Sequence, residues 1–370
     1  MKKMIFTAAM MLASAAAMAQ SGTFQIKGNV EGLPDSLVAM IGRKTENIEV
    51  KKKKFEFSKN FDKPQWVYLC DQKVIKSGAF SAIPVFAIPS ETIEMKGNFT
   101  GGVDIKGGKF YQEQDLMDEY KGQAYKDIKA LWKWYSDNVN DSNRDSIEKV
   151  VDERMEPLQK KYAADLLAYA KQHSDQECIA LLIDELDDVK DKETLISLMA
   201  DNVKNGRMKA YYEPIFERAK KRAEMEEKAK VVQASGVEAP DFTLNDINGK
   251  PFSLSCLRGK YVVIDFWGSW CIWCIKGMPK MKEYYEKYKG KFEILGVDCN
   301  DTEAKWKAAV EKHQLPWIHV YNPKGSDVLD KYAVQGFPTK IVVGPDGKIV
   351  KTIVGEDPAF YTLLDEVLGK

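Results

Sequence analysis

The sequence predicts a multidomain α+β protein: a small N-terminal antiparallel β-sandwich, a helical middle segment and a C-terminal α/β domain. Three patterns predict it. Apolar and polar residues alternate over residues 20–110, apolar residues recur at helical spacing over 111–234, and short apolar runs alternate with helical stretches over 235–370. The 370-residue chain is too long for one compact domain, and its 44% hydrophobic share is sufficient for packed cores.

Residues 1–19 are expected to be a signal peptide and not part of the fold. Lys2 and Lys3 form a basic start, and the apolar run that follows ends in the small-x-small pattern Ala17-Met18-Ala19. The run is shorter than the roughly 20 residues that span a bilayer, although an uncleaved anchor remains the alternative. Gln20 follows, not the cysteine of a lipoprotein. We therefore expect export to the periplasm or cell envelope, with no membrane span after cleavage.

The β-rich part begins with Phe24, Ile26 and Val30, which alternate with polar residues as in a half-buried strand. Further short runs, separated by Gly, Pro and Asn, are expected at residues 37–41, 55–57, 66–69, 85–88 and 92–95. The lysine run 51–54 is interpreted as a solvated hairpin tip, because acidic residues lie close on either side. A basic binding patch is the alternative.

The middle segment has helical periodicity. Tyr162, Leu166 and Tyr169 lie on one stripe of a predicted helix. Asp191 is interpreted as a helix start and Gly206 as a stop. The charged stretch that follows is expected to be an exposed helix or linker.

The C-terminal part is predicted to be a small α/β sandwich. Its first buried strand spans residues 261–266, interrupted by Asp265, and a helix follows over 279–289. The remaining elements are expected in the order strand 292–297, helix 303–313, strands 340–343 and 349–354, and helix 360–368.

Charge and cysteine content exclude some functions. Lys and Arg number 55, as do Asp and Glu, so no net charge attracts nucleic acid or anionic lipid. Among six cysteines, Cys271 and Cys274 form the closely spaced pair, and no second pair with zinc-ligand spacing accompanies it. We therefore expect no metal and no cofactor. Two alternative interpretations of the Cys271 and Cys274 pair are half of a zinc site and a purely structural disulfide.

The Cys271-Ile272-Trp273-Cys274 segment lies where a strand is predicted to end and a helix to begin. The unpaired N–H groups and positive end of a helix favour a thiolate at the first cysteine. One helical turn brings the second thiol close enough to form a disulfide. The sequence therefore predicts a redox-active dithiol at Cys271 and Cys274.

The residues from Val263 to Pro279, together with Gly336-Phe337-Pro338-Thr339, resemble the thioredoxin superfamily. The lead-in Ala239-Pro240-Asp241-Phe242-Thr243-Leu244 is typical of TlpA/ResA-like thiol:disulfide oxidoreductases and of related AhpC/TSA, peroxiredoxin-type domains. The resemblance covers residues 235–370 and implies a thioredoxin-like fold there. Residues 22–110 resemble, less strongly, an uncharacterised β domain that often precedes such domains in bacterial envelope proteins.

The resemblance implies roles for single residues. Cys271 matches the attacking cysteine, Cys274 the resolving one, and Pro338 a cis-proline that leaves the backbone of Phe337 free to pair with a substrate. Asp265 matches a buried acid, whose raised pKa would suit proton exchange with Cys274, although a hydrogen-bonded structural acid is the alternative. The residues expected to contact the substrate are Trp270, Phe337 and Thr339.

Three departures from the family pattern stand out. Ile272-Trp273 replaces the commoner Gly-Pro or Pro-Pro, so the redox potential does not carry over. Gly277 replaces a glutamate found below the active site in ResA-like proteins, which leaves Asp265 as the expected acid. Phe337 is bulkier than the usual residue before the cis-proline, which narrows the expected substrate groove.

We therefore expect an extracytoplasmic thiol:disulfide oxidoreductase with protein or small-molecule disulfides as substrates. The resemblance implies the reductase direction, recharging by a membrane electron donor and a part in cell redox homeostasis. A peroxiredoxin-like enzyme with antioxidant activity is one alternative, weakened because Trp267-Gly268-Ser269-Trp270-Cys271 lacks the proline of such sites. An envelope binding protein with a secondary thioredoxin domain is another.

Overall fold

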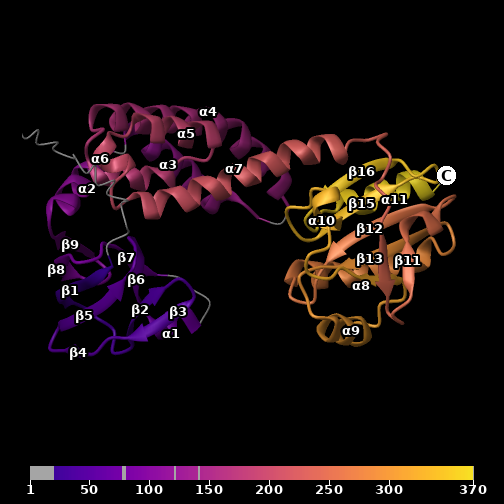
Figure 1. Cartoon of the computed structure of the whole chain (residues 1–370), viewed down its shortest axis with the longest axis horizontal. Coiled ribbons are helices and arrows are strands. Elements are labelled where there is room, and N and C mark those ends of the chain that lie inside the picture. The colour runs from indigo at the N-terminus through magenta and orange to yellow at the C-terminus, as the bar shows by residue number, and fades with distance from the viewer. Residues whose placement is uncertain (1–20, 77–80, 121, 141, 370) are drawn as a thin grey trace, which may run out of the picture. The chain divides into compact units, whose positions relative to one another are not determined.

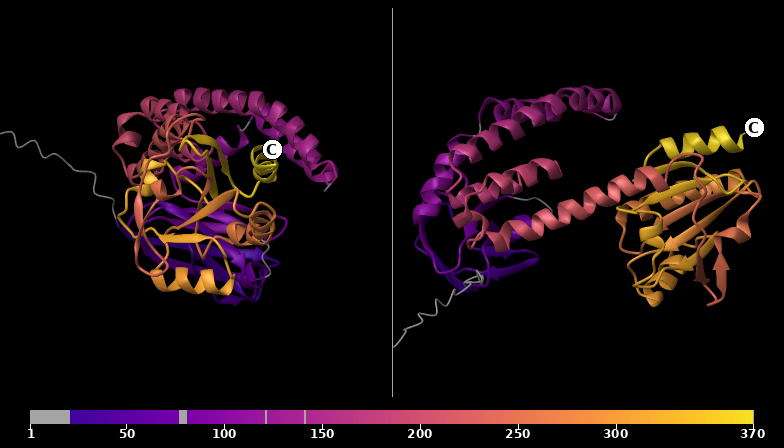
Figure 2. Two further views of the ribbon diagram at one scale, coloured as in Figure 1. Left: turned by 90° about the vertical axis from the view of Figure 1, so that its right-hand side faces the viewer. Right: turned by 45° about the horizontal axis from the view of Figure 1, so that its top comes forward.

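The computed structural model describes residues 21–76, 81–120, 122–140 and 142–369 (Figures 1 and 2). The chain divides into two compact units, the first ending at Ala219 and the second beginning at Lys220. The predicted signal peptide, residues 1–19, lies outside the described residues. In the part of the chain that is described, no helix has both the length and the apolar content needed to cross a bilayer.

The first unit contains a mixed five-stranded sheet in the order β4-β5-β1-β8-β9. Strand β1 (Gly22–Glu31) pairs antiparallel with β5 (Lys54–Phe61) but parallel with β8 (Thr92–Asn98). The prediction of a purely antiparallel sandwich is therefore wrong for this sheet. The physical reason is that β1 and β8 are joined by a long connection that includes a second sheet, and parallel pairing requires such a crossover. The remaining strands are β4 (Val50–Lys51) and β9 (Gly102–Lys106).

The second sheet of this unit is antiparallel throughout, in the order β3-β2-β6-β7. Its strands are β2 (Leu37–Ile41), β3 (Lys44–Asn47), β6 (Gln65–Asp71) and β7 (Ala82–Ala87), and the short helix α1 (Gln72–Lys76) follows β6. In the first sheet, Lys52 and Lys53 have positive φ angles and connect β4 to β5. The lysine run is thus a hairpin tip, as predicted.

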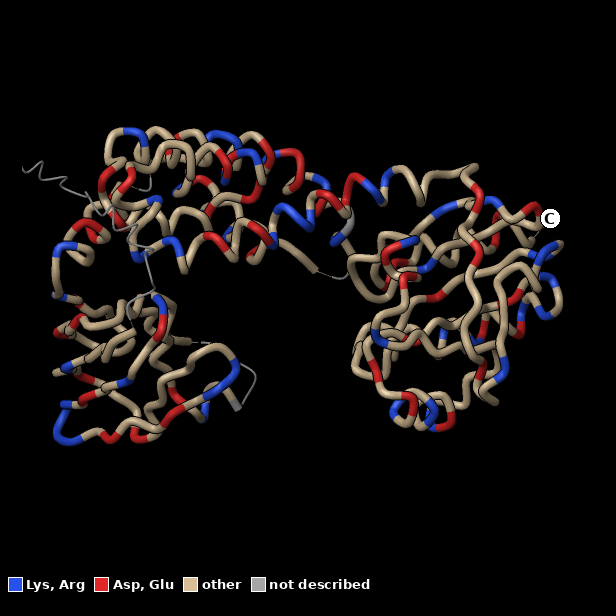
Figure 3. The backbone as a smooth tube through the Cα atoms, in the orientation of Figure 1, with Lys and Arg blue, Asp and Glu red and all other residues tan. Residues whose placement is uncertain are grey.

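Helices follow the sheets: α2 (Lys109–Glu119), α3 (Gly122–Asn138), α4 (Arg144–Gln172), the 3₁₀ helix η1 (Glu177–Ile183), α5 (Val189–Leu198), α6 (Asp201–Lys204) and α7 (Lys209–Val232). The predicted stripe of Tyr162, Leu166 and Tyr169 is buried on α4. Helix α5 begins earlier than predicted, because the side chain of Asp188 caps it by accepting the N–H of Lys190. The charged stretch after residue 217 is helical within α7, where both signs of charge alternate (Figure 3).

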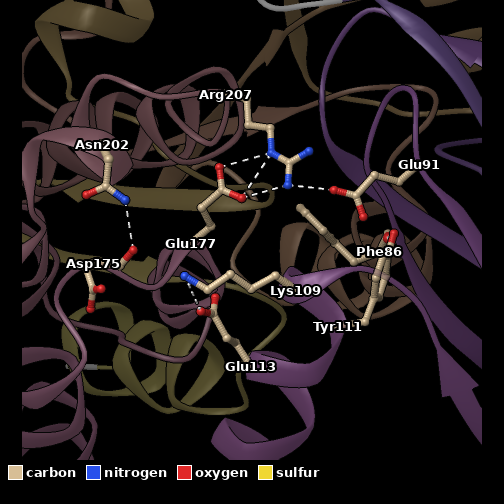
Figure 4. A network of polar contacts seen from close by, with 9 residues as sticks. All are labelled: Phe86, Glu91, Lys109, Tyr111, Glu113, Asp175, Glu177, Asn202 and Arg207. Carbon is tan, nitrogen blue, oxygen red and sulfur yellow. Dashed lines mark hydrogen bonds and ion pairs between the residues drawn. The ribbon is translucent and has the colours of Figure 1, made fainter.

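Helices and sheets of the first unit contribute to a common hydrophobic core, and a smaller cluster of Leu131, Val151 and Met155 forms between α3 and α4. Phe24 and Leu69 from the two sheets belong to the same buried cluster as Leu166 from α4. An ion-pair network joins the same parts (Figure 4). Arg207 contacts Glu91 after β7 at 2.6 Å and Glu177 of η1 at 2.7 Å.

The second unit is built on a seven-stranded sheet in the order β11-β10-β14-β13-β12-β15-β16. The central strand β12 (Tyr261–Trp267) is parallel to β13 (Phe292–Asp298) and antiparallel to β15 (Thr339–Val343). The other strands are β10 (Thr243–Asp246), β11 (Pro251–Ser253), β14 (Ile318–Tyr321) and β16 (Ile349–Val354). The helices are η2 (Leu254–Leu257), α8 (Ile272–Lys287), α9 (Glu303–Lys312), α10 (Val328–Lys331) and α11 (Ala359–Leu368).

Each face of this sheet has its own core. Val263 and Trp267 of β12 belong to the cluster with α8, α9 and α11, whereas Val262 and Ile264 belong to the cluster of the other face. Successive side chains of a strand point to opposite faces. Asp265, two residues from both Val263 and Trp267, therefore points toward the face covered by α8.

Candidate active site

The two cysteines meet at the start of α8. Cys271 and Cys274 form a disulfide, and Cys271 is the N-cap residue of the helix. The sulfur of Cys271 accepts the backbone N–H of Cys274 at 3.1 Å. The helix begins at Ile272, at the Cys-x-x-Cys segment as predicted, so it is longer than the expected stretch 279–289 at its start, and Pro279 lies inside it. After reduction, the free N–H groups of the first turn favour negative charge on the Cys271 sulfur.

An exposed apolar rim surrounds the buried disulfide. Cys271 and Cys274 are 5% and 4% exposed, whereas Trp270, Ile272 and Trp273 are 52%, 63% and 57% exposed. Large apolar side chains at such exposure are unusual on a surface that contacts only water. The rim offers a partner apolar contact next to the sulfur atoms.

The loop before β15 lies against this rim. The Phe337–Pro338 peptide bond is cis, as the resemblance implies. The Phe337 ring contacts the Trp270 ring edge-on, with centroids 5.3 Å apart, and Trp270 Nε1 donates to the Cys299 carbonyl at 3.0 Å. Thr339 Oγ1 donates to the Gly336 carbonyl at 2.8 Å. Among the described residues, the backbone N–H and C=O of Phe337 form no hydrogen bond, so both are available to a partner.

A groove of about 660 Å³ lies beside the same loop. Within the second unit, it runs between the C-terminal part of α7 and the residues around the cis-proline. Met225 and Ala229 line one side, and Gly336, Thr339 and Val354 line the other. The groove can hold an extended segment longer than a single side chain.

Asp265 lies on the face of β12 that α8 covers. It is 6% exposed, and its Oδ1 has no hydrogen-bond partner among the described residues. Burial raises the pKa of Asp265 from 3.8 to about 6; the positive charge of Lys340 lowers it and the negative charge of Glu356 raises it. A carboxyl group that titrates near pH 6 can accept and return a proton at neutral pH.

Sequence reasoning missed Lys340 and Glu356. Lys340, paired with Asp265 across β12 and β15, is 1% exposed, and its Nζ donates to Glu356 Oε2 at 2.7 Å. Tyr361 donates its hydroxyl to Glu356 Oε1 at 2.8 Å. A lysine inside the apolar run Lys340-Ile341-Val342-Val343 was the available signal, because a buried lysine requires a partner.

The other four cysteines are free. Cys70, Cys178 and Cys299 are buried, and Cys256 is exposed. Cys299 follows β13 and is fully buried, and burial raises the pKa of its thiol. A thiol with a raised pKa is a poor nucleophile at neutral pH, so Cys299 is not expected to react. No group of three His, Cys, Asp or Glu with metal-site geometry occurs within the described ranges.

Comparison with known proteins defines the class. A model of the AhpC/TSA family matches residues 235–352. Thiol-disulfide oxidoreductase ResA of Bacillus cereus is 42% identical over 122 residues, which are 33% of this chain and 70% of that protein. ResA of Bacillus subtilis is 35% identical over 123 residues, 33% of this chain and 68% of that protein. A solved thioredoxin domain of a thiol-disulfide oxidoreductase from Bacteroides vulgatus is 36% identical, with a TM-score of 0.35, and the match covers 36% of this chain and 98% of that one.

The ResA relatives define a thioredoxin-superfamily enzyme that exchanges thiols and disulfides. The chain belongs to the ResA family of thiol-disulfide oxidoreductases. The predicted family and enzyme class are therefore confirmed. The matches cover about a third of the chain, and they do not characterise the N-terminal β domain.

Proposed function

We propose that the protein is an extracytoplasmic disulfide reductase that works through Cys271 and Cys274. The observation that carries the proposal is the disulfide at the start of α8, bordered by an exposed apolar rim and by the unpaired backbone of Phe337. Family membership supports the class of reaction. The expected signal peptide supports export, and the family resemblance supports the reductase direction and a membrane electron donor.

In the proposed reaction the reduced protein meets a substrate disulfide. The Cys271 thiolate attacks one substrate sulfur, forms a mixed disulfide and releases the other sulfur as a thiolate. Cys274 then gives its proton to Asp265 and attacks the Cys271 sulfur. This step forms the Cys271–Cys274 disulfide and releases the second substrate sulfur. The substrate gains two electrons and the protein dithiol loses two; the electron donor returns them by reducing Cys271–Cys274.

The site favours a polypeptide substrate, although small disulfides fit the same chemistry. An extended strand can pair with the N–H and C=O of Phe337, as a strand added to a free sheet edge does. Trp270, Phe337 and Thr339 surround that position and are the proposed contact residues. The groove beside Met225 and Val354 gives the strand space to continue.

Alkylation and peptide mapping test the assignment of the two cysteines. The reduced protein is treated briefly with iodoacetamide near neutral pH, and Cys271 is expected to be labelled well before Cys274, because Cys271 is the N-cap residue and Cys274 lies inside the helix. Cys271→Ser is expected to abolish reduction of insulin, and Cys274→Ser to trap mixed disulfides through Cys271. Cys256→Ser is the matched control, since Cys256 is a free, exposed cysteine. Faster labelling of Cys274 contradicts the assignment, and peroxide consumption without insulin reduction indicates the peroxiredoxin alternative.

A further inference from the structure

The carboxylate of Glu356 packs against α8 at Gly277, where the helix has no side chain. An ideal Cβ built on Gly277 would lie 2.2 Å from Glu356 Oε2, 2.4 Å from its Cδ and 2.6 Å from its Oε1. Real Cβ atoms do not approach so closely. Glu356 follows β16, and Gly277 is one turn after Cys274 on α8. The carboxylate of Glu356 therefore fills the space that a side chain at position 277 would occupy.

Two hydrogen bonds hold this carboxylate in place. Lys340 Nζ donates to one oxygen at 2.7 Å and the Tyr361 hydroxyl to the other at 2.8 Å. The same hydroxyl lies 3.4 Å from the Gly277 carbonyl, so Tyr361 joins the carboxylate to the backbone of α8. With two donors directed at it, the side chain of Glu356 is fixed and not free to swing aside.

The charges of Lys340 and Glu356 also affect the pKa of Asp265. Glu356 raises the pKa of Asp265 and Lys340 lowers it, so the two charges oppose one another at that carboxyl. The titratable groups that act on Asp265 or Glu356 are Lys340 on β15, Tyr361 on α11 and Cys299 after β13, and Tyr284 on α8 lies beside Tyr361. Lys340 is the cation among these groups. Removal of either member of the pair leaves the other to act on Asp265 without compensation.

We propose that Glu356 is a positioning residue of the proton-transfer step, because its carboxylate pairs with Lys340, the cross-strand partner of Asp265, and occupies the space above Gly277. The role in turnover rests on the proposed function. The placement over Gly277 and the effect on Asp265 do not, and they can be measured in a protein of any activity.

A carboxyl-carbon NMR titration measures the effect on Asp265 directly. In Glu356→Gln, the titration of Asp265 is expected to move to lower pH by about one pH unit, because Lys340 then acts alone. Lys340→Met is expected to move it to higher pH. The exposed Glu366→Gln on α11 is the control and should leave it unchanged. If Glu356→Gln lowers thermal stability but leaves the Asp265 titration in place, Glu356 is merely structural and the proposal is wrong.

A double-mutant cycle tests the placement without reference to activity. Alanine is preferred to glycine inside a helix, so Gly277→Ala should raise the melting temperature when the space is empty. We expect this gain in the Glu356→Ala background and a loss in the wild type. If Glu356→Ala alone does not fold, Lys340→Met combined with Glu356→Ala removes both charges of the pair and serves as the background. An equal gain in both backgrounds overturns the placement.

The two measurements separate the failure of this inference from failure of the proposed function. If the wild type does not reduce insulin but the cycle and the titration give the expected results, the proposed function fails and the role of Glu356 toward Asp265 stands. If insulin is reduced and Glu356→Gln shifts neither the titration nor the pH dependence of turnover, the inference fails alone.

Discussion

Replacing Asp265 by asparagine should make the second unit more stable at neutral pH and less active. In the folded protein the pKa of Asp265 is raised from 3.8 to about 6, mainly by burial. Ionisation of this carboxyl is therefore harder in the folded than in the unfolded chain. The folded state binds the proton more tightly, so stability falls as pH rises from about 3.8 to about 6 and stays level above that range.

The magnitude follows from the difference in pKa. A difference of about 2 corresponds to ~3 kcal/mol at roughly 1.4 kcal/mol per pKa unit. The asparagine side chain cannot ionise, so the Asp265→Asn protein does not lose this stability as the pH rises. We expect the free energy of unfolding of Asp265→Asn, relative to that of the wild type, to increase by about 3 kcal/mol between pH 3.5 and pH 7.5.

The oxidised protein is unfolded in urea, and hydrogen exchange of peptides from β12 monitors the unfolding. This measurement gives the free energy of unfolding of the second unit alone. Asp330→Asn is the matched control, because Asp330 is an exposed aspartate of the same unit. On the functional side, loss of a general base costs roughly 10²–10⁴-fold in rate, so Asp265→Asn should slow insulin reduction and accumulate mixed disulfides through Cys271. If the free energies of unfolding of Asp265→Asn and wild type change with pH in the same way, burial does not raise the pKa of Asp265 as argued. Insulin turnover at the wild-type rate from pH 6 to 8 would refute the proton-transfer role.

Three further predictions concern other parts of the chain. Mass analysis of protein from the cell envelope should find Gln20 as the mature N-terminus, and an intact Met1 contradicts the predicted cleavage. Trp270→Ala removes the ring contact with Phe337 and the hydrogen bond to the Cys299 carbonyl. The kcat/KM for insulin should therefore fall about 5- to 10-fold, which corresponds to ~1 kcal/mol, while the Cys271–Cys274 disulfide still forms. Arg207→Met leaves two carboxylates of the first unit without their cation and should destabilise that unit by about 2 kcal/mol in urea, while Cys271 alkylation is unchanged.

The elements of the second unit could be predicted well, because its strands are continuous apolar runs. The predicted strand 349–354 coincides with β16 (Ile349–Val354), and 261–266 lies within β12 (Tyr261–Trp267). The strand β14 (Ile318–Tyr321) was missed, since four residues containing a buried His319 give no periodic signal. Strand pairing was harder, because the pattern of β1 specifies which face is buried but not whether β8 joins it parallel or antiparallel.

In the candidate site, too, local features could be predicted from the sequence and contacts between distant residues could not. Cys271 and Cys274 are visible in sequence because three residues of separation and a helix start define the pair locally. Lys340 and Glu356 come from distant parts of the chain, and only the pairing of β12 with β15 brings Lys340 beside Asp265. In the sequence, glycine at position 277 indicated only a missing acid. The structure places Glu356 in the same space from another element.

Stabilisation of the Cys271 thiolate and proton transfer to Asp265 depend on different parts of the fold. The charge on the Cys271 sulfur depends on the N–H groups at the start of α8, which are local to the Cys-x-x-Cys segment. The pKa of Asp265 is raised first by burial, and is then lowered by Lys340 and raised by Glu356, which come from β15 and from the segment after β16. Substitutions at Ile272 and Trp273 should therefore alter the redox potential while the titration of Asp265 stays in place, whereas Glu356→Gln should do the reverse. The two properties can be adjusted separately because they originate in separate parts of the fold.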